Sequence, residues 1–304
     1  MTTPLSYPEA IIMGAVQGIS ELFPISSLGH AVIIPALVGG QWASDLSVSA
    51  PESPYLAFIV GLHVATALAL LLFFWRDWVR IIGGFVTSIR YRRLSNSSER
   101  LAWLIILATI PVGIIGLLLE HTFRTVLGTP LPAAAFLAAN GVVLLVGELV
   151  RRRGLRTAEI AERTRAESGD ERDEDVILGT MSIRRGVLIG TVQSVALLPG
   201  ISRSGVTMVA GMAAGLTHRE AARFSFLLAT PVIFAAGLLK LPDLFGPLGA
   251  GIHGQVLAGS AAAFVCALFA VAFLDRYFRT RTLIPFAVYS LVAGVASFLV
   301  LLFR

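Results

Sequence analysis

The sequence predicts an all-α polytopic membrane protein with an inverted-topology repeat, in which each half has one re-entrant helical hairpin and three transmembrane helices. Of the 304 residues, 56% are hydrophobic and only 14% are charged, which is too apolar for a soluble globular domain. Most charges fall in a few short loops between long apolar segments. Two further apolar segments, one in each half, are interrupted by a polar turn that contains proline.

Six apolar segments are long enough to cross a bilayer, which takes about 20 helical residues. They lie at about 56–75, 101–119, 133–150, 224–241, 254–274 and 283–303. The loop 76–100 carries six arginines and the loop 151–185 carries nine, so both are expected on the cytoplasmic side. Arginines in 217–223 and 275–282 place these loops on the same side. The net charge of +5 therefore reflects membrane orientation and does not indicate nucleic-acid binding.

Under this assignment the segment 186–215 begins and ends on the same side, so it must enter the membrane and return. Two half-helices of about a dozen residues each reach about 18 Å, near the middle of a hydrocarbon core about 30 Å thick. Pro199-Gly200 supplies the break between them. Non-helical backbone at that depth must be covered by protein or line a wet cavity, so the tip of this hairpin is expected to line a cavity.

The first apolar segment, 8–36, resembles this hairpin at a fixed offset of 176 residues. The pairs of identical residues include Gly14 and Gly190, Gln17 and Gln193, Ser26 and Ser202, and Gly29 and Gly205. Chance similarity between segments rich in small residues is the alternative. One hairpin plus three spans crosses the membrane an odd number of times, which places the two halves in opposite orientations. Residues 1–150 are thus the first repeat, 151–185 a charged cytoplasmic linker, partly helical or disordered, and 186–304 the second repeat; both termini are expected outside.

Arg203 alone among 24 lysines and arginines lies in the middle of an apolar stretch. A guanidinium at membrane depth costs about 2.5–3.5 kcal/mol on insertion scales, so it is normally kept there to meet an anion or an acidic partner. Nearby hydroxyls and glycines can supply donors and converging backbone N–H groups for phosphate oxygens. These candidate anion-binding residues are Gly200, Ser202, Ser204, Gly205 and Thr207. An arginine that pairs with a buried acid and serves only packing is the alternative.

Gln17 and Glu21 are four residues apart, so they share one face of a helix that Phe23-Pro24 then breaks. A carboxylate and an amide oxygen suit a hard divalent cation, Mg²⁺ or Ca²⁺, which would bridge phosphate oxygens. Hydrogen bonding between helices is the alternative role for Gln17. We expect both side chains to point into one cavity.

Ser26, Ser27 and His30 follow this break. A serine needs a neighbouring base to become a nucleophile, and a histidine three or four residues away can supply one. We expect Ser26 to cap the second half-helix and count it among the substrate-binding residues, while Ser27 keeps the chemical role. His63, in the following span, is a weaker candidate that lines the cavity or merely packs.

These residues form motifs that resemble the bacterial undecaprenyl-diphosphate phosphatase family linked to bacitracin resistance. The motifs are Gln17-x-x-x-Glu21, Phe23-Pro24-Ile25-Ser26-Ser27-Leu28-Gly29-His30 and Pro199-Gly200-Ile201-Ser202-Arg203-Ser204-Gly205-Val206-Thr207. The resemblance runs through nearly the whole chain. It implies an inner-membrane enzyme that uses a divalent cation, at a site open to the periplasm, to remove the terminal phosphate of undecaprenyl diphosphate. The monophosphate carrier then returns to cell-wall synthesis.

The resemblance also implies roles for the candidate residues. Glu21 becomes an essential acid near the metal, Ser27 and His30 become nucleophile and base, and Arg203 joins Ser202 and Thr207 in a diphosphate cradle. Many relatives have glutamate where this chain has Gln17, so Gln17 is expected only to orient metal or water.

Two questions stay open at this point. The attacking group is Ser27, helped by His30, or a water held by Glu21. A polyprenyl-phosphate transporter or flippase that uses the same anion site is the alternative function, because inverted repeats and broken helices are typical of carriers. The expected partners are the polyprenyl diphosphate and membrane lipids, and the sequence leaves a homodimer open.

Overall fold

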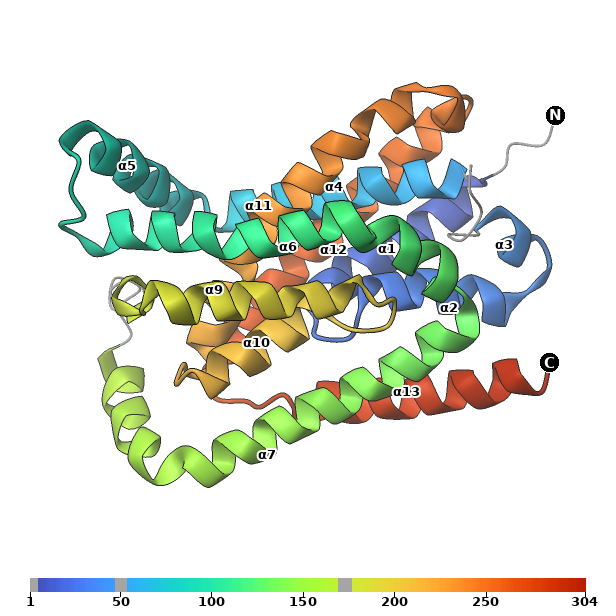
Figure 1. The fold of residues 1–304 in the computed structure, drawn as a ribbon. Coiled ribbons are helices and arrows are strands. Elements are labelled where there is room, and N and C mark those ends of the chain that lie inside the picture. Colours follow the sequence, from blue (N-terminus) through green and yellow to red (C-terminus); the bar gives the residue numbers. More distant parts are fainter. Residues whose placement is uncertain (1–4, 47–53, 169–176) are drawn as a thin grey trace.

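The computed structural model describes residues 5–46, 54–168 and 177–304 (Figure 1). Within these ranges the chain consists of helices joined by turns and contains no β-strand. In the described part of the chain, six helices are long and apolar enough to cross a membrane, as predicted. They are α4 (Pro54–Phe73), α6 (Ser97–Leu127), α7 (Pro130–Ser168), α11 (His218–Phe245), α12 (His253–Tyr277) and α13 (Ile284–Leu302).

Two pairs of shorter helices stand where the interrupted segments were predicted. In the first pair, α1 (Tyr7–Leu22) is separated from α2 (Ser27–Val38) by a break at 23–26. In the second, α9 (Ile183–Val192) continues as the 3₁₀ turn η1 (Gln193–Leu197), and a break at 198–202 precedes α10 (Arg203–Ala213). The breaks therefore fall at the prolines, as the sequence predicts.

The two breaks are built alike. The Oγ of Ser26 accepts a hydrogen bond from the Gly29 N–H at 3.2 Å, and the Oγ of Ser202 accepts one from the Gly205 N–H at 3.2 Å. Each serine thus caps the second helix of its pair and satisfies a donor that would otherwise lack a partner. For Ser26 this confirms the expected capping role.

Each break also touches the second helix of the other pair. A side chain at Gly29 would place its Cβ 2.9 Å from the Gly200 Cα, so the two backbones meet at van der Waals distance. The hydroxyl of Ser204 donates to the Phe23 carbonyl at 3.2 Å. Residues 23 and 204, from opposite halves of the chain, are therefore joined in the interior of the bundle.

The long helices pack in an alternating pattern around the breaks. α1 lies against α12, while α9 lies against α6; α4 packs on α11 and α7 on α13. Figure 1 shows α7 and α13 side by side along one edge of the bundle. Each contact therefore joins an element of the first half to an element of the second.

The basic loop at 76–100 differs from expectation, because most of it is a helix, α5 (Trp75–Tyr91). Gly84 lets it pack closely on the start of α6, since a Cβ there would lie 2.7 Å from the Ser98 carbonyl carbon. The Trp103 indole donates to the Ser88 hydroxyl at 2.9 Å. Interspersed arginines lower the hydropathy of this segment and conceal its helical pattern.

The remaining elements are short. α3 (Gly40–Asp45) follows α2, and the 3₁₀ turn η2 (Pro247–Gly249) follows α11. α7 extends past the predicted span to Ser168, so the first part of the charged segment 151–185 is helical, while residues 169–176 lie outside the described ranges.

Candidate active site

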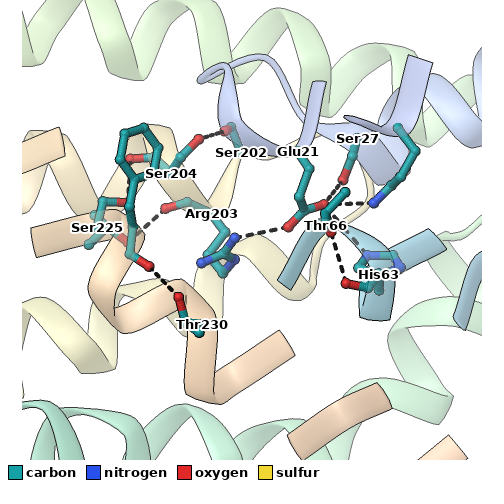
Figure 2. A network of polar contacts seen from close by, with 12 residues as sticks. Glu21, Ser27, His63, Thr66, Ser202, Arg203, Ser204, Ser225 and Thr230 are labelled. Carbon is teal, nitrogen blue, oxygen red and sulfur yellow. Dashed lines mark hydrogen bonds and ion pairs between the residues drawn. The ribbon is translucent and has the colours of Figure 1, made fainter. Parts of the chain in front are cut away.

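Glu21, near the end of α1, is the centre of a polar network that joins the two breaks (Figure 2). Its Oε1 accepts a hydrogen bond from Arg203 Nη2 at 2.9 Å. Its Oε2 accepts one from the Ser27 hydroxyl at 2.5 Å and one from Gln17 Nε2 at 3.0 Å. Glu21 is 7% exposed, so its carboxylate is stabilised by these hydrogen-bond partners rather than by water. The structure thus brings together four of the candidate residues from α1, α2 and α10.

Arg203, the first residue of α10, pairs with this buried acid through only one of its two terminal nitrogens. Its Nη1 is buried and has no hydrogen-bond partner among the described residues, and its side chain is 14% exposed. A buried donor without a partner costs about 1–3 kcal/mol and calls for an explanation, of which binding of an ion is one. The ion pair with Glu21 leaves this part of the guanidinium available to an anion.

His30 is placed away from Ser27. Its Nδ1 lies 2.7 Å from the Ser26 carbonyl oxygen, its Nε2 lies 2.8 Å from the Tyr289 hydroxyl, and its ring stacks on Tyr289 with centroids 5.8 Å apart. Both ring nitrogens are therefore engaged. The structure does not bring His30 and Ser27 together, and the base within reach of the Ser27 hydroxyl is Glu21.

His63, on α4, is the histidine that lies beside Glu21. Its Nε2 is 3.6 Å from Glu21 Oε2, its side chain is 28% exposed, and its Nδ1 is 2.9 Å from the Ile59 carbonyl oxygen. The signal in the sequence was that α4 carries no other charged or basic residue. Spacing along the chain, however, does not reveal which face of α4 meets α1.

The other candidates for the anion cradle stabilise the second break in this arrangement. Ser202 and Ser204 have their hydroxyl oxygens 3.0 Å apart, and Thr207 donates to the Arg203 carbonyl at 2.7 Å. Gly200 has φ +112, and a Cβ there would overlap the Ala133 carbonyl oxygen. At Gly205 a Cβ would come within 3.0 Å of a Leu144 methyl carbon. Contacts of these residues with a substrate stay a prediction.

Asn140, on α7, is a residue that the sequence reasoning missed. Its Nδ2 donates to the Pro24 carbonyl at 3.0 Å and to the Ser290 hydroxyl at 3.2 Å, and its Oδ1 accepts from the Ser202 N–H at 3.0 Å. Asn140 is 0% exposed. One amide therefore connects both breaks. A single asparagine in the predicted span 133–150 was the available signal.

Comparison with known proteins identifies the family. A family model described as bacitracin resistance protein BacA matches residues 10–296. The chain belongs to this family. Proteins named undecaprenyl-diphosphatase from Mycolicibacterium paratuberculosis and Mycobacterium avium are each 64% identical to this chain over 306 residues. Each of these alignments covers 100% of this chain and 100% of the relative. A protein named undecaprenyl-diphosphatase 2 from Frankia alni is 50% identical over 330 residues and covers 95% of this chain and 96% of its own.

As a BacA-family member with six helices able to span a membrane, the chain is a multi-pass protein of the bacterial inner membrane. The described residues contain no group of three or more His, Cys, Asp or Glu side chains that could hold a metal ion. Glu21, Gln17 and His63 nevertheless converge. This donor set fits a divalent cation whose remaining ligands are substrate oxygens and water, which is how Mg²⁺ is commonly held.

Proposed function

We propose that the chain is an integral membrane phosphatase that hydrolyses undecaprenyl diphosphate to undecaprenyl phosphate and inorganic phosphate. The observation that carries the proposal is the buried Nη1 of Arg203, which has no hydrogen-bond partner among the described residues and lies beside the hydrogen-bonded pair Ser27–Glu21. Phosphoryl transfer needs positive donors for the oxygens of the transferred group and a base for the attacking hydroxyl. The names of relatives at 64% identity support the lipid diphosphate as substrate. This activity would recycle the lipid carrier for cell-wall synthesis and confer bacitracin resistance.

In the reaction, Arg203 Nη1 binds an oxygen of the terminal phosphate. Ser27 transfers its proton to Glu21 Oε2 and its Oγ forms a bond to phosphorus, while the bond from phosphorus to the bridging oxygen breaks and undecaprenyl phosphate leaves. Water then releases phosphate from the serine. The 2.5 Å contact supports Glu21 as the base, because a base must lie within hydrogen-bond reach of the proton that it removes. In the second route Glu21 activates a water that attacks phosphorus directly.

We propose that Glu21 and Gln17 hold a divalent cation, Mg²⁺ or Ca²⁺. When bound, the cation would neutralise charge on the phosphate oxygens. Gln17 now directs its Nε2 at Glu21, so its amide would rotate to offer the oxygen. The charges of Glu21 and Arg203 nearly cancel, and the cation is therefore expected to bind well only together with the anionic diphosphate.

The inverted repeat with two re-entrant hairpins belongs to this proposal. It is supported by the matching serine caps 176 residues apart and by the exchange of packing partners between halves. In Figure 1 the start of α1 and the end of α13 lie at one end of the bundle, and α5 and the last turns of α7 lie at the other. The arginines of α5 and of the segment 151–185 support a cytoplasmic location for the latter end, and we infer from this that both termini and the site face outside.

Phosphate release in detergent tests the proposed function, because a micelle has no compartments and a pure carrier would release none. Purified wild-type protein is expected to release inorganic phosphate from undecaprenyl diphosphate. Arg203→Ala is expected to lower kcat by about 100-fold to 1,000-fold, the usual cost of removing one charge-stabilising donor. Arg203→Lys, the matched control, keeps the charge without the planar fork and should retain intermediate activity. If the wild-type protein released no phosphate, the phosphatase proposal would be contradicted and the transporter or flippase function would be favoured.

A further inference from the structure

We propose that His63 is a third protein ligand of the divalent cation and that this site therefore accepts Mn²⁺ as well as Mg²⁺. The inference rests on the proposed function, because it assumes that a cation binds beside Glu21. His63 has no role in the reaction steps given above, and among the described residues it is the only histidine with a ring nitrogen within 4.0 Å of a Glu21 carboxylate oxygen.

The ring of His63 is oriented for metal binding. Its Nδ1 is 2.9 Å from the Ile59 carbonyl oxygen, and a carbonyl oxygen only accepts hydrogen bonds, so Nδ1 carries the hydrogen. In the neutral ring Nε2 then holds a lone pair. Histidines that bind metals almost always donate their other N–H to a carbonyl, a carboxylate or water. The hydrogen bond within α4 therefore fixes the tautomer that binds a cation through Nε2.

The distance between Nε2 and Glu21 Oε2 also fits a shared ion. At 3.6 Å it is longer than a charge-assisted hydrogen bond, which measures about 2.7–2.9 Å. Two ligand atoms that each lie about 2.1 Å from one ion are about 3.0–3.4 Å apart at bond angles of 90–109°. A shift of a few tenths of an ångström would bring the two atoms to that spacing. Figure 2 shows His63 and Arg203 on different sides of Glu21, so a cation beside His63 would not displace the guanidinium.

Gln17 completes the set. Its amide lies 3.0 Å from the same Oε2, and rotation of the amide would present its oxygen. The protein then offers two oxygens from α1 and one nitrogen from α4. Mg²⁺ and Ca²⁺ favour oxygen ligands, whereas an imidazole nitrogen suits transition metals. A mixed set of this kind admits Mn²⁺, which binds carboxylate and imidazole alike.

Electron spin-echo envelope modulation of bound Mn²⁺ tests the assignment without relying on turnover. The full-length protein in detergent is loaded with Mn²⁺ and methylenediphosphonate, which resists hydrolysis. Wild-type protein is expected to show a ³¹P coupling from the diphosphonate and a ¹⁴N coupling that changes to a ¹⁵N pattern when histidine is ¹⁵N-labelled. His63→Leu should lose the nitrogen coupling, keep the ³¹P coupling and bind Mn²⁺ at least about 10-fold more weakly, the scale of loss found even for residues that only support a ligand.

His30→Gln is the matched control, because His30 is the other histidine of the predicted site and bonds to Tyr289 instead of Glu21. It should keep the nitrogen coupling of the wild type. A ³¹P coupling without any nitrogen coupling in wild-type protein would overturn the role of His63 and leave the phosphatase proposal intact. The absence of both couplings would instead contradict the cation site itself. The ¹⁵N-labelled wild type decides the question even if His63→Leu does not fold.

Discussion

Asn140 connects the two breaks, and its removal should impair catalysis more than binding. In Asn140→Ala the Pro24 carbonyl, the Ser202 N–H and the Ser290 hydroxyl each lose a hydrogen bond. At about 1–3 kcal/mol for each buried group left without a partner, the free energy of unfolding should fall by at least about 3 kcal/mol. The breaks carry Ser27 on one side and Arg203 on the other, and a displacement of about 1 Å between reacting groups can cost about 100-fold in rate.

We therefore expect kcat for phosphate release to fall by about 100-fold in Asn140→Ala, with a smaller change in KM, because Arg203 keeps its free donor. Ser290→Ala is the control, since it removes one of the three bonds and leaves Asn140 attached to both breaks. It should cost about 1 kcal/mol and preserve kcat.

Phosphate release in detergent and thermal unfolding, measured on the same preparations, provide both quantities. Asn140→Asp separates hydrogen bonding from side-chain volume. It retains an acceptor for the Ser202 N–H, but it places an oxygen where the amide N–H donated to the Pro24 carbonyl, and two acceptors repel each other. We expect it to be at least as damaging as alanine. If Asn140→Ala loses stability as expected but retains the wild-type kcat, the amide only stabilises the bundle and does not set the geometry of the site.

Two further substitutions test the attacking group and the second break. Ser27→Ala should abolish phosphate release and any phosphoprotein that acid quenching traps; retained turnover would show that a water held by Glu21 attacks. Gly200→Ala should destabilise the protein by about 1–3 kcal/mol, because Gly200 has φ +112 and no room for a Cβ. Gly83→Ala is its control in thermal unfolding, since a Cβ meets nothing within 4 Å there and alanine should stabilise the helix by about 0.5–1 kcal/mol. Equal unfolding midpoints for the two alanine variants would contradict this explanation.

The sequence predicted the features that follow from length, charge and local spacing. The six spans were found because each is a long apolar run, and both breaks because a proline stands in each short segment. The contact between Gln17 and Glu21 followed from their spacing on a helix. Glu21 and Arg203 are 182 residues apart and form an ion pair. The sequence predicted that Arg203 meets either an anion or a buried acid, but it did not identify the acid.

Features that depend on the docking of helices could not be predicted. The partner of Ser27 depends on how the chain turns at Ser26, which adopts φ +70, and this turn directs Ser27 at Glu21 while His30 contacts Tyr289. Asn140 gains its importance only because α7 lies against both breaks. In such cases the sequence indicates what a side chain can do chemically, but it does not indicate which residue the side chain will contact.

Ser27 and Arg203 are each the first residue of a helix, α2 and α10, and both side chains bond to Glu21, so the positive ends of two helices lie beside this acid. Each of these ends is equivalent to about half an elementary charge. This fixed contribution comes from the peptide groups, so no side-chain substitution removes it. A protein that has lost the guanidinium would therefore still attract a phosphate, and the poor turnover expected for Arg203→Ala should accompany measurable residual affinity for the substrate.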